Sequence, residues 1–444
     1  MLWERVKNLL LDKKIFFKGS TVLVFTTVLS YALGLLRDRI LATTFGASRA
    51  LDAYNAAFTL PDLILNIFVA GALTAAFVPI FSELSVKERK AEADQFTNSV
   101  ISSSLGVVII SGLAVFFLTP ALSKIIVPGF SPEERSVFTN LTRLLLLSPI
   151  IFSISNTFGN ILLIKNKNFW YGISAACYNL GIIGGAVFLS PKFGIYGVAL
   201  GAIGGAVFHL ISRMIGLGKL EGLKLKIKVN EEFKKFIRLM LPKVIGHPIE
   251  QLTFLGFTII ASTVGSGAIA ILNFARNFQS MPINIIGVNL ALAVFPALAR
   301  AEAEDNKNYF RSELNFVLKF SFALTLAAAV LMIVLRKFLI GLFLGGGAFG
   351  PDAVAATATT LAFFSLSIPG ESACHVLARG FYSLKDSLTP VLVGLVSLIF
   401  SIGLGYMFAK QMGVPGLALG FFFGSTLKTL ILLGLIRIKT SKLA

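Results

Sequence analysis

The sequence contains few of the residues that build metal and catalytic sites. Its 444 residues include only two cysteines and three histidines, and charged residues make up 14% of the chain. Cys177 and Cys374 both lie inside apolar runs, which favours packing roles over a disulfide or a metal site. The sequence has no HExxH motif, no closely spaced cysteine pair and no glycine-rich phosphate loop after a strand. We therefore predict that the protein is not an enzyme, and the sequence assigns no metal ligand and no cofactor.

Hydrophobic residues, by contrast, make up 55% of the chain and are spread along its whole length. They form runs of about 18 to 25 residues, each long enough to cross the hydrocarbon core of a membrane as a helix. We predict an all-α polytopic membrane protein. The expected spans are 20–46, 53–82, 95–119, 137–163, 169–190, 195–217, 233–263, 267–297, 310–340, 353–381, 387–409 and 415–437.

The net charge of +18 comes mainly from short connections between the apolar runs. Basic clusters such as KERK at 87–90 and KNK at 165–167 fall in the even-numbered connections. Because lysine and arginine accumulate on the cytoplasmic side of membrane proteins, both termini are expected in the cytoplasm. The basic, amphipathic segment 1–19 is expected to lie on that face of the membrane. This placement argues against a nucleic-acid-binding role.

The two halves of the chain resemble each other. GIYGVALG at 194–201 returns as GVPGLALG at 413–420, an offset of 219 residues, and PGF at 128–130 matches GAF at 347–349 at the same offset. FVPIFSEL around Pro79 matches VFPALARAE around Pro296 at an offset of 217. Four matches in the same order, counting the repeated GxxxGxxxG pattern, indicate a duplication.

Each repeat holds six spans, and an even number of spans returns the chain to the same side of the membrane. The repeats are therefore expected to be parallel lobes around a central cavity. We place the first lobe at 20–217, a cytoplasmic linker at 218–232 and the second lobe at 233–444. Two packed bundles without a cavity are the alternative.

Three charged residues, Arg37, Asp38 and Arg39, follow an uncharged run that could span the membrane. Three charges facing lipid would cost on the order of 8–10 kcal/mol, so they should pair, face water or lie near an interface. Either the first span ends at Leu36 or the helix continues through the charges. Successive helical residues are about 100° apart, so Arg37 and Arg39 point to opposite sides. We expect Arg37 and Asp38 to face inward and Arg39 to pair elsewhere or reach the interface.

Further polar residues recur at membrane depth. Arg143 lies near the outer start of the fourth span, and Arg276 lies within the eighth. Several inward arginines would suit a pyrophosphate-bearing or polyanionic substrate, because guanidinium groups bind phosphate oxygens bidentately. His247 and Glu250 in the seventh span are three residues apart and share a helix face. They could bind a coupling cation, or they could form a neutral hydrogen-bonded pair.

Segments spread over nearly the whole chain resemble one family. They are RDRILATTFGASRALDAYNAAFTLPDLI, GALTAAFVPIFSEL, TPALSKIIVPGF, LTRLLLLSP, MPINIIGVNLALAVFPALA, GGGAF and LARGFYSLKDSLTP. In this order they resemble the MurJ (MviN) lipid II flippases of the MOP superfamily. The resemblance implies a bacterial cytoplasmic membrane protein that moves undecaprenyl-linked peptidoglycan precursor for cell-wall biogenesis, and hence for cell shape. It also implies a cationic cavity.

Carried over by position, the family's Arg-Asp pair of the first span matches Arg37 and Asp38. The acidic residue that opens the second span matches Asp52, and the outer arginine of the fourth matches Arg143.

The chain also departs from the family's pattern. Arginines that the family places in spans 1, 2 and 8 fall on Tyr31, Leu65 and Asn277, with Arg276 one place before Asn277. The family usually has fourteen spans, whereas we predict twelve, and its last pair helps to bind the lipid tail.

These observations predict a flippase for lipid II that works by alternating access. Arg37, Arg276 and Arg143, with Asn277 beside them, are the expected substrate contacts, while Asp38 and Asp52 pair with arginines and hold or gate the cavity. A cation-coupled small-molecule or multidrug antiporter, or a flippase for another polyprenyl-linked glycan, is the alternative. Transport is expected to be coupled to sodium, protons or the membrane potential, and the protein is expected to be a monomer.

Overall fold

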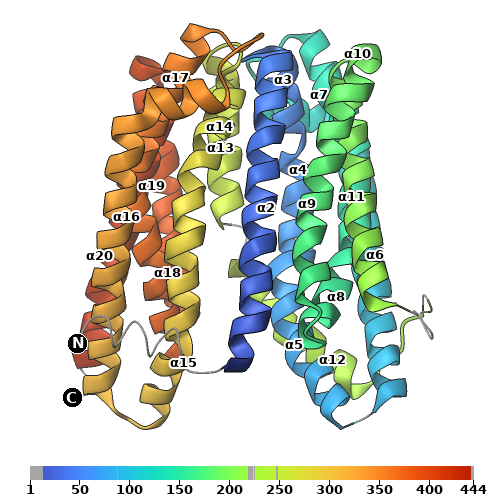
Figure 1. The fold of residues 1–444 in the computed structure, drawn as a ribbon, viewed down its shortest axis with the longest axis vertical. Helices are drawn as coiled ribbons and strands as arrows, with labels where there is room; N and C mark the ends of the chain where they lie inside the picture. The colour runs from blue at the N-terminus through green and yellow to red at the C-terminus, as the bar shows by residue number, and fades with distance from the viewer. Residues whose placement is uncertain (1–13, 88, 219–223, 225, 247–248, 442–444) are drawn as a thin grey trace. The chain divides into compact units, whose positions relative to one another are not determined.

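The computed structural model describes residues 14–87, 89–218, 224, 226–246 and 249–441, nearly all of them in helices (Figure 1). The elements of the first half are α2 Lys14–Phe45, α3 Arg49–Ala57, α4 Thr59–Leu65, the π-helical turn η1 Asn66–Ala70, α5 Gly71–Val86, α6 Lys90–Ile126, α7 Pro132–Leu145, α8 Leu147–Ile164, α9 Asn168–Gly184, the π-helical turn η2 Gly185–Leu189, α10 Ser190–Phe193 and α11 Ile195–Leu217. Those of the second half are α12 Glu231–Gly246, α13 Ile249–Val264, α14 Ala268–Pro282, the π-helical turn η3 Ile283–Val288, α15 Asn289–Ala303, α16 Lys307–Phe343, α17 Pro351–Ser365, α18 Ile368–Ser383, α19 Leu388–Met412 and α20 Val414–Ser441.

The predicted all-α membrane fold is confirmed. Eight helical segments of the described residues are each long and apolar enough to cross a membrane, and α17 with α18 form a ninth that is bent by 42°. The remaining predicted spans, 20–46, 53–82 and 233–263, coincide with α2, with α3 to α5 and with α12 to α13. Within the last of these the structure describes α12 as far as Gly246 and α13 from Ile249, and the two residues between them lie outside the described part of the chain.

The helix of the first predicted span continues through its charges. α2 runs without interruption from Lys14 to Phe45, so the helix does not end at Leu36, and where the membrane span itself ends stays a prediction. The helix ends where Gly46 adopts a left-handed backbone, with φ of +65°. The three charged residues 37–39 are therefore helical. Because neighbouring residues of a helix point about 100° apart, their side chains lie in different surroundings. Of the N-terminal segment 1–19, residues 1–13 lie outside the described part of the chain.

The helices form two compact units. Unit 1 comprises residues 1–44, 53–126 and 130–251, and unit 2 comprises 45–52, 127–129 and 252–444. Two short segments from the first half of the chain therefore belong to unit 2. The predicted lobe boundaries come from the sequence repeat and not from contacts between helices, and they stay a prediction.

Aromatic packing explains why α12 belongs to unit 1. Phe236 of α12 is buried and meets the ring of Phe96 of α6 edge-on, with centroids 5.9 Å apart. Phe96 in turn stacks on Phe77 of α5 at 5.2 Å. These rings lie in one hydrophobic cluster with Phe233, so α12 buries its apolar face against α5 and α6. The basic composition of the linker at 218–232 indicates that the linker is exposed to solvent. It does not indicate which unit α12 belongs to.

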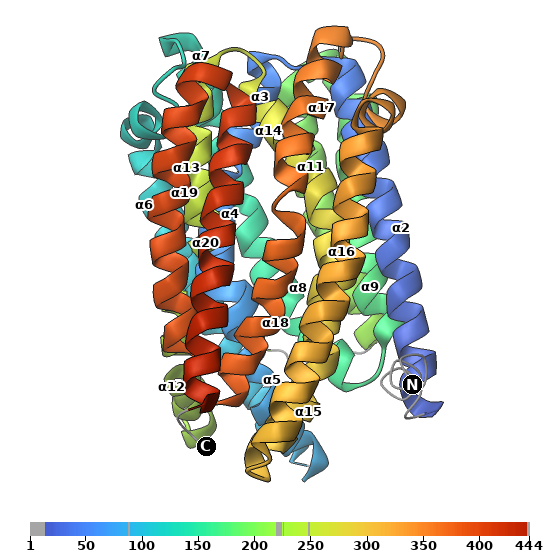
Figure 2. The same ribbon diagram turned by 90° about the vertical axis from the view of Figure 1, so that its left-hand side faces the viewer.

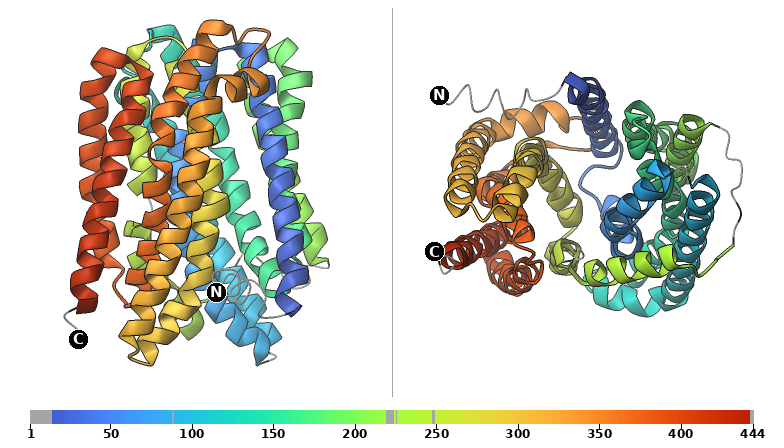
Figure 3. Two further views of the ribbon diagram at one scale, coloured as in Figure 1. Left: turned by 60° about the vertical axis from the view of Figure 1, so that its left-hand side comes forward. Right: turned by 90° about the horizontal axis from the view of Figure 1, so that it is seen from below.

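Small residues bring helices together in the same way in both halves. A Cβ atom on Gly181 of α9 would collide with the backbone of Gly205 of α11. Likewise, a Cβ on Gly420 of α20 would collide with the backbone of Gly405 of α19. Each pair of helices lies side by side over its length, α9 with α11 in unit 1 and α19 with α20 in unit 2 (Figure 2, Figure 3). Close backbone approach through glycine is a common means of helix association in membranes.

Two of the three described π-helical turns, η1 and η3, also repeat. η1 begins at Asn66 and η3 begins at Ile283, which are 217 residues apart (283 − 66). The helices that follow, α5 and α15, each contain an internal proline, Pro79 and Pro296, at the same offset. A shared helical irregularity at a shared offset supports the predicted duplication independently of the sequence matches.

Asp386 lies in the connection between α18 and α19, and its side chain contacts residues of α19 and α20. Its carboxylate accepts hydrogen bonds from the backbone N–H of Thr389 (3.0 Å), from the Thr389 hydroxyl (2.7 Å) and from Lys439 Nζ (2.6 Å). Burial alone would raise the pKa of Asp386, but the bonds from Lys439 and Thr389 outweigh it and lower this pKa from 3.8 to about 2. The folded protein therefore favours the ionised carboxylate, and the stability this supplies is present above pH 4 and lost as the pH falls toward 2.

We expect Asp386→Ala to lower the free energy of unfolding by about 1 kcal/mol at neutral pH, with the shift discounted for solvent screening. Thermal unfolding of the purified protein, followed from pH 6 to pH 3, measures this. The difference from the unmodified protein should shrink as the pH falls, and Lys439→Met should weaken the same pH dependence. A difference that is constant with pH would contradict the role of the ionised carboxylate.

Candidate functional site

Arg37 and Asp38 form a polar cluster inside unit 1. Nε and Nη2 of Arg37 donate to Oδ1 of Asp38 at 2.9 and 2.7 Å. Nη1 of Arg37 donates to Oδ1 of Asn179, a residue of α9, at 3.0 Å. Asp38 is 3% exposed, whereas the Arg37 side chain keeps 23% of its surface exposed. The expected pairing of Arg37 with Asp38 is observed, and Arg39 is exposed, in agreement with its expected position away from them.

The guanidinium of Arg37 retains binding capacity. It carries five N–H donors, and its contacts with the described residues use three. The two others lie on Nη1 and Nη2, the neighbouring nitrogens that can bind two oxygens of one phosphate group. The cluster therefore combines a neutralised carboxylate with a partly exposed arginine that can bind an anion.

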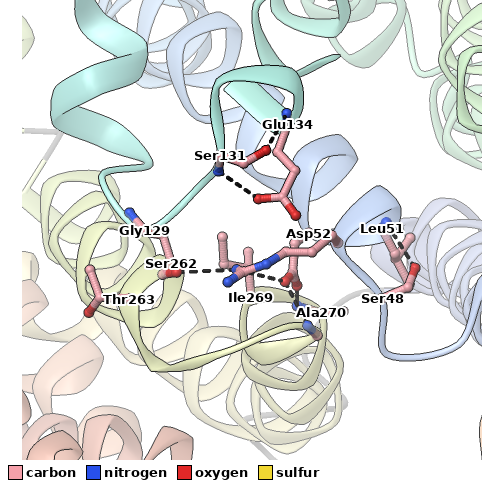
Figure 4. A network of polar contacts seen from close by, with 12 residues as sticks. Ser48, Leu51, Asp52, Gly129, Ser131, Glu134, Ser262, Thr263, Ile269 and Ala270 are labelled. Atoms are coloured by element: carbon pink, nitrogen blue, oxygen red, sulfur yellow. Dashed lines mark hydrogen bonds and ion pairs between the residues drawn. The ribbon is translucent and has the colours of Figure 1, made fainter. Parts of the chain in front are cut away.

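Asp52 lies in unit 2 and caps a helix (Figure 4). Its Oδ2 accepts from the backbone N–H of Gly267 at 2.7 Å, and its Oδ1 accepts from that of Ala270 at 2.8 Å. These donors belong to the start of α14, where backbone N–H groups have no partner within the helix. Asp52 is 0% exposed, and Arg49 lies 3.7 Å from its carboxylate. The expected arginine partner is thus Arg49, from the same short helix.

The segments around Asp52 and Gly129 fit closely against the rest of unit 2. A Cβ on Gly46 would collide with the carbonyl of Ala348, and one on Gly129 would collide with the carbonyl of Ser262. The backbone N–H of Gly129 also donates to Ser262 Oγ at 3.3 Å. Arg49 Nη1 donates to the carbonyl of Ser262 at 3.2 Å, so Ser262 contacts both segments. Polar and steric contacts together hold 45–52 and 127–129 in unit 2.

The other two predicted arginines are held by aromatic residues of their own units. In unit 1, Arg143 Nε donates to the Phe116 carbonyl at 3.1 Å, and its guanidinium lies 4.7 Å from the centroid of the Phe116 ring. In unit 2, the guanidinium of Arg276 lies 3.3 Å from the centroid of the Phe254 ring. Asn277 is exposed, whereas Arg276 is partly buried. The structure gives each arginine an aromatic support, and the substrate contacts assigned to them stay predictions.

The predicted coupling pair is only partly described. His247 lies outside the described residues, and Glu250 is exposed in the first turn of α13. Their pairing stays a prediction. Among the residues the structure describes, no group of three or more histidine, cysteine, aspartate or glutamate side chains is placed to hold a metal ion.

Sequence reasoning missed two buried polar residues of unit 1, Asn179 and Arg213. Arg213 of α11 donates from Nη1 to the carbonyl of Ser155 (2.7 Å) and to Asn156 Oδ1 (3.0 Å), and from Nε to Ser174 Oγ (3.1 Å). These contacts tie α11 to α8 and α9. An arginine within an apolar span was a signal that could have identified Arg213, whereas a lone asparagine gave no comparable signal for Asn179.

The fold is that of a membrane transporter. A multidrug resistance MATE family transporter of the MOP superfamily, in an inward-facing conformation, superposes with a TM-score of 0.79 and 17% identity over 93% of this chain and 94% of that one. At this identity the likeness shows the shared fold and no more.

The family is shown by comparisons at higher similarity. The family model described as "Lipid II flippase MurJ" matches residues 41–442. The lipid II flippase MurJ of Burkholderia cenocepacia is 28% identical over 421 residues, covering 91% of this chain and 81% of the relative. A solved structure of lipid II flippase MurJ in an inward closed conformation matches with a TM-score of 0.81 and 26% identity, covering 95% of this chain and 89% of that one. The chain belongs to the MurJ lipid II flippase family.

Proposed function

We propose that this protein flips lipid II, the lipid-linked peptidoglycan precursor, across the bacterial cytoplasmic membrane by alternating access. The observation that carries the proposal is the Arg37 cluster. Its carboxylate is neutralised by Arg37, and the guanidinium keeps two donors for an anion. A pyrophosphate-linked lipid supplies such an anion, and the relatives named above are lipid II flippases.

The same cluster argues against export of cationic drugs. A cationic substrate is recognised by carboxylates and aromatic faces, and the only acid in this cluster, among the described residues, already pairs with Arg37 at 2.7 Å. Releasing Asp38 for a drug would leave a charged guanidinium unpaired inside the membrane, which is costly.

The proposal includes three details that accompany the family assignment. The positive-inside pattern supports cytoplasmic placement of both termini. Coupling to sodium, protons or the membrane potential would supply the driving force. The protein would act as a monomer, with each chain forming its own pathway.

Reconstitution tests the function directly. The purified chain is placed in liposomes that contain fluorescent lipid II in both leaflets, and a membrane-impermeant quencher reports transfer between them. Protein-dependent loss of the protected fraction is expected, whereas protein-free liposomes should keep it. A protected fraction unchanged by the protein, together with efflux of a cationic dye from the same vesicles, would overturn the proposal in favour of an antiporter.

A further inference from the structure

We infer that Asn179 is a positioning residue that holds the guanidinium of Arg37 in its anion-binding orientation. The inference rests on the proposed function, because Arg37 is taken there as the phosphate contact. Asn179 lies on α9, 142 residues from Arg37, and it is 7% exposed. Its amide oxygen is occupied by Arg37, so in the proposed site it acts through Arg37.

The amide of Asn179 has one orientation that fits its surroundings. Its Nδ2 faces three acceptors, the Ser30 carbonyl (3.1 Å), Ser30 Oγ (3.4 Å) and the Ala175 carbonyl (3.3 Å). An amide nitrogen donates and cannot accept, so the nitrogen belongs on this side and the oxygen faces Arg37. The groups on the two sides of the amide therefore fix its orientation, in which the oxygen accepts the hydrogen bond from Nη1 of Arg37.

The backbone around Asn179 lies close against α2. Gly172 lies seven residues before Asn179 on the same face of α9, and a Cβ there would collide with Thr26 of α2. Ser30 and Arg37 lie seven residues apart on α2. Contacts two helical turns apart thus dock α9 onto α2, so the position of the amide relative to Arg37 is set by helix packing and not by a flexible loop.

Asp38 alone would not fix the guanidinium. Nε and Nη2 both point to the single oxygen Oδ1 of Asp38, so the guanidinium could pivot about that atom. The bond from Nη1 to Asn179 supplies a second, separate anchor. With both anchors in place, the remaining donors on Nη1 and Nη2 keep one direction. Ordering a charged group before the ligand arrives lowers the entropy cost of binding.

Lipid II binding to the purified full chain in nanodiscs tests the inference through a double-mutant cycle. We expect Asn179→Leu, which keeps the shape of the side chain, to weaken binding about tenfold, as is typical for loss of a hydrogen bond to a charged group. In the Arg37→Ala background the same change should have less than about a twofold effect, because coupled residues are not additive. Asn160→Leu is the matched control, since Asn160 is also buried in unit 1 and its Nδ2 has no hydrogen-bond partner among the residues that the structure describes.

A second measurement does not depend on lipid II. Phenylglyoxal modifies arginine, and mass spectrometry of the Arg37 peptide should show faster modification in Asn179→Leu than in the unmodified protein or in Asn160→Leu. Asn179→Ala, which removes the amide without adding a group that must be accommodated, should likewise speed this modification and weaken lipid II binding. This variant answers the question if Asn179→Leu does not fold.

The outcomes separate the two claims. Failure of the unmodified protein to bind lipid II, with faster modification in Asn179→Leu, would overturn the proposed function and leave the positioning role. Binding that depends on Arg37 but is unchanged in Asn179→Leu, with unchanged modification, would overturn the positioning role alone. An equal loss of binding in the Arg37→Ala background would show a general structural role and would also overturn it.

Discussion

Arg37→Ala should reduce lipid II transport by about 100-fold, the largest functional loss we expect from any single change. Removing the guanidinium deletes the two donors available to phosphate and the ion pair with Asp38, and charge-assisted bidentate contacts are among the strongest hydrogen bonds in proteins. Transport in the liposome quenching assay measures the loss. Arg37→Lys keeps the charge but lacks the planar pair of donors, so an intermediate loss of about tenfold is expected.

Arg39→Ala is the matched control for this prediction. Arg39 lies on the same helix two residues later, carries the same charge and is exposed. Its removal changes the net charge of the helix as much as Arg37→Ala does, but it leaves the cluster intact, so transport should stay within about twofold of the unmodified protein. Equal losses in the two variants would show that net charge, and not the geometry of the cluster, governs transport.

Asp52→Ala should cause the largest loss of stability, about 2–3 kcal/mol of unfolding free energy. The change leaves the backbone N–H groups of Gly267 and Ala270 without their acceptor at a site that is completely buried. It also removes the ion pair with Arg49. Unfolding of the purified protein measures the loss, and transport should fall with it because 45–52 loses its main polar tie to α14.

Asp352→Ala is the corresponding control. Asp352 also lies in the first turn of a helix, α17, but it is exposed. Its loss should cost less than about 0.5–1 kcal/mol, the value of a solvent-screened charge at a helix N-terminus. A similar cost for the two aspartates would mean that the buried bonds of Asp52 add little.

The sequence allowed the helices and one half of the candidate site to be predicted. Long apolar runs predicted the spans because a membrane helix satisfies its own backbone hydrogen bonds and needs no long-range partner. The pairing of Arg37 with Asp38 could be predicted because the two residues are neighbours in the sequence and because unpaired charges inside a membrane are costly. Asn179 could not be predicted in the same way, because its role depends on which face of α9 meets α2.

Long-range partners account for the remaining gaps. The donors bound by Asp52 lie 215 and 218 residues away along the chain. Arg276 was predicted from its charge within an apolar span, and its guanidinium lies over the ring of Phe254 on the preceding helix. In each case the charged residue could be identified in the sequence. The group that it contacts depends on how the helices pack together, which the sequence does not show.

The π-helical turns η1 and η3 bear on the history of the chain. A π turn holds one more residue than the α-helical turn it replaces, and such turns occur frequently at functional sites. Its presence at the same offset as the repeated prolines implies that the extra residue entered a six-helix ancestor before that ancestor was doubled. The irregularity is then older than the two-unit protein, and both copies kept it although it begins at Asn66 in one and at Ile283 in the other.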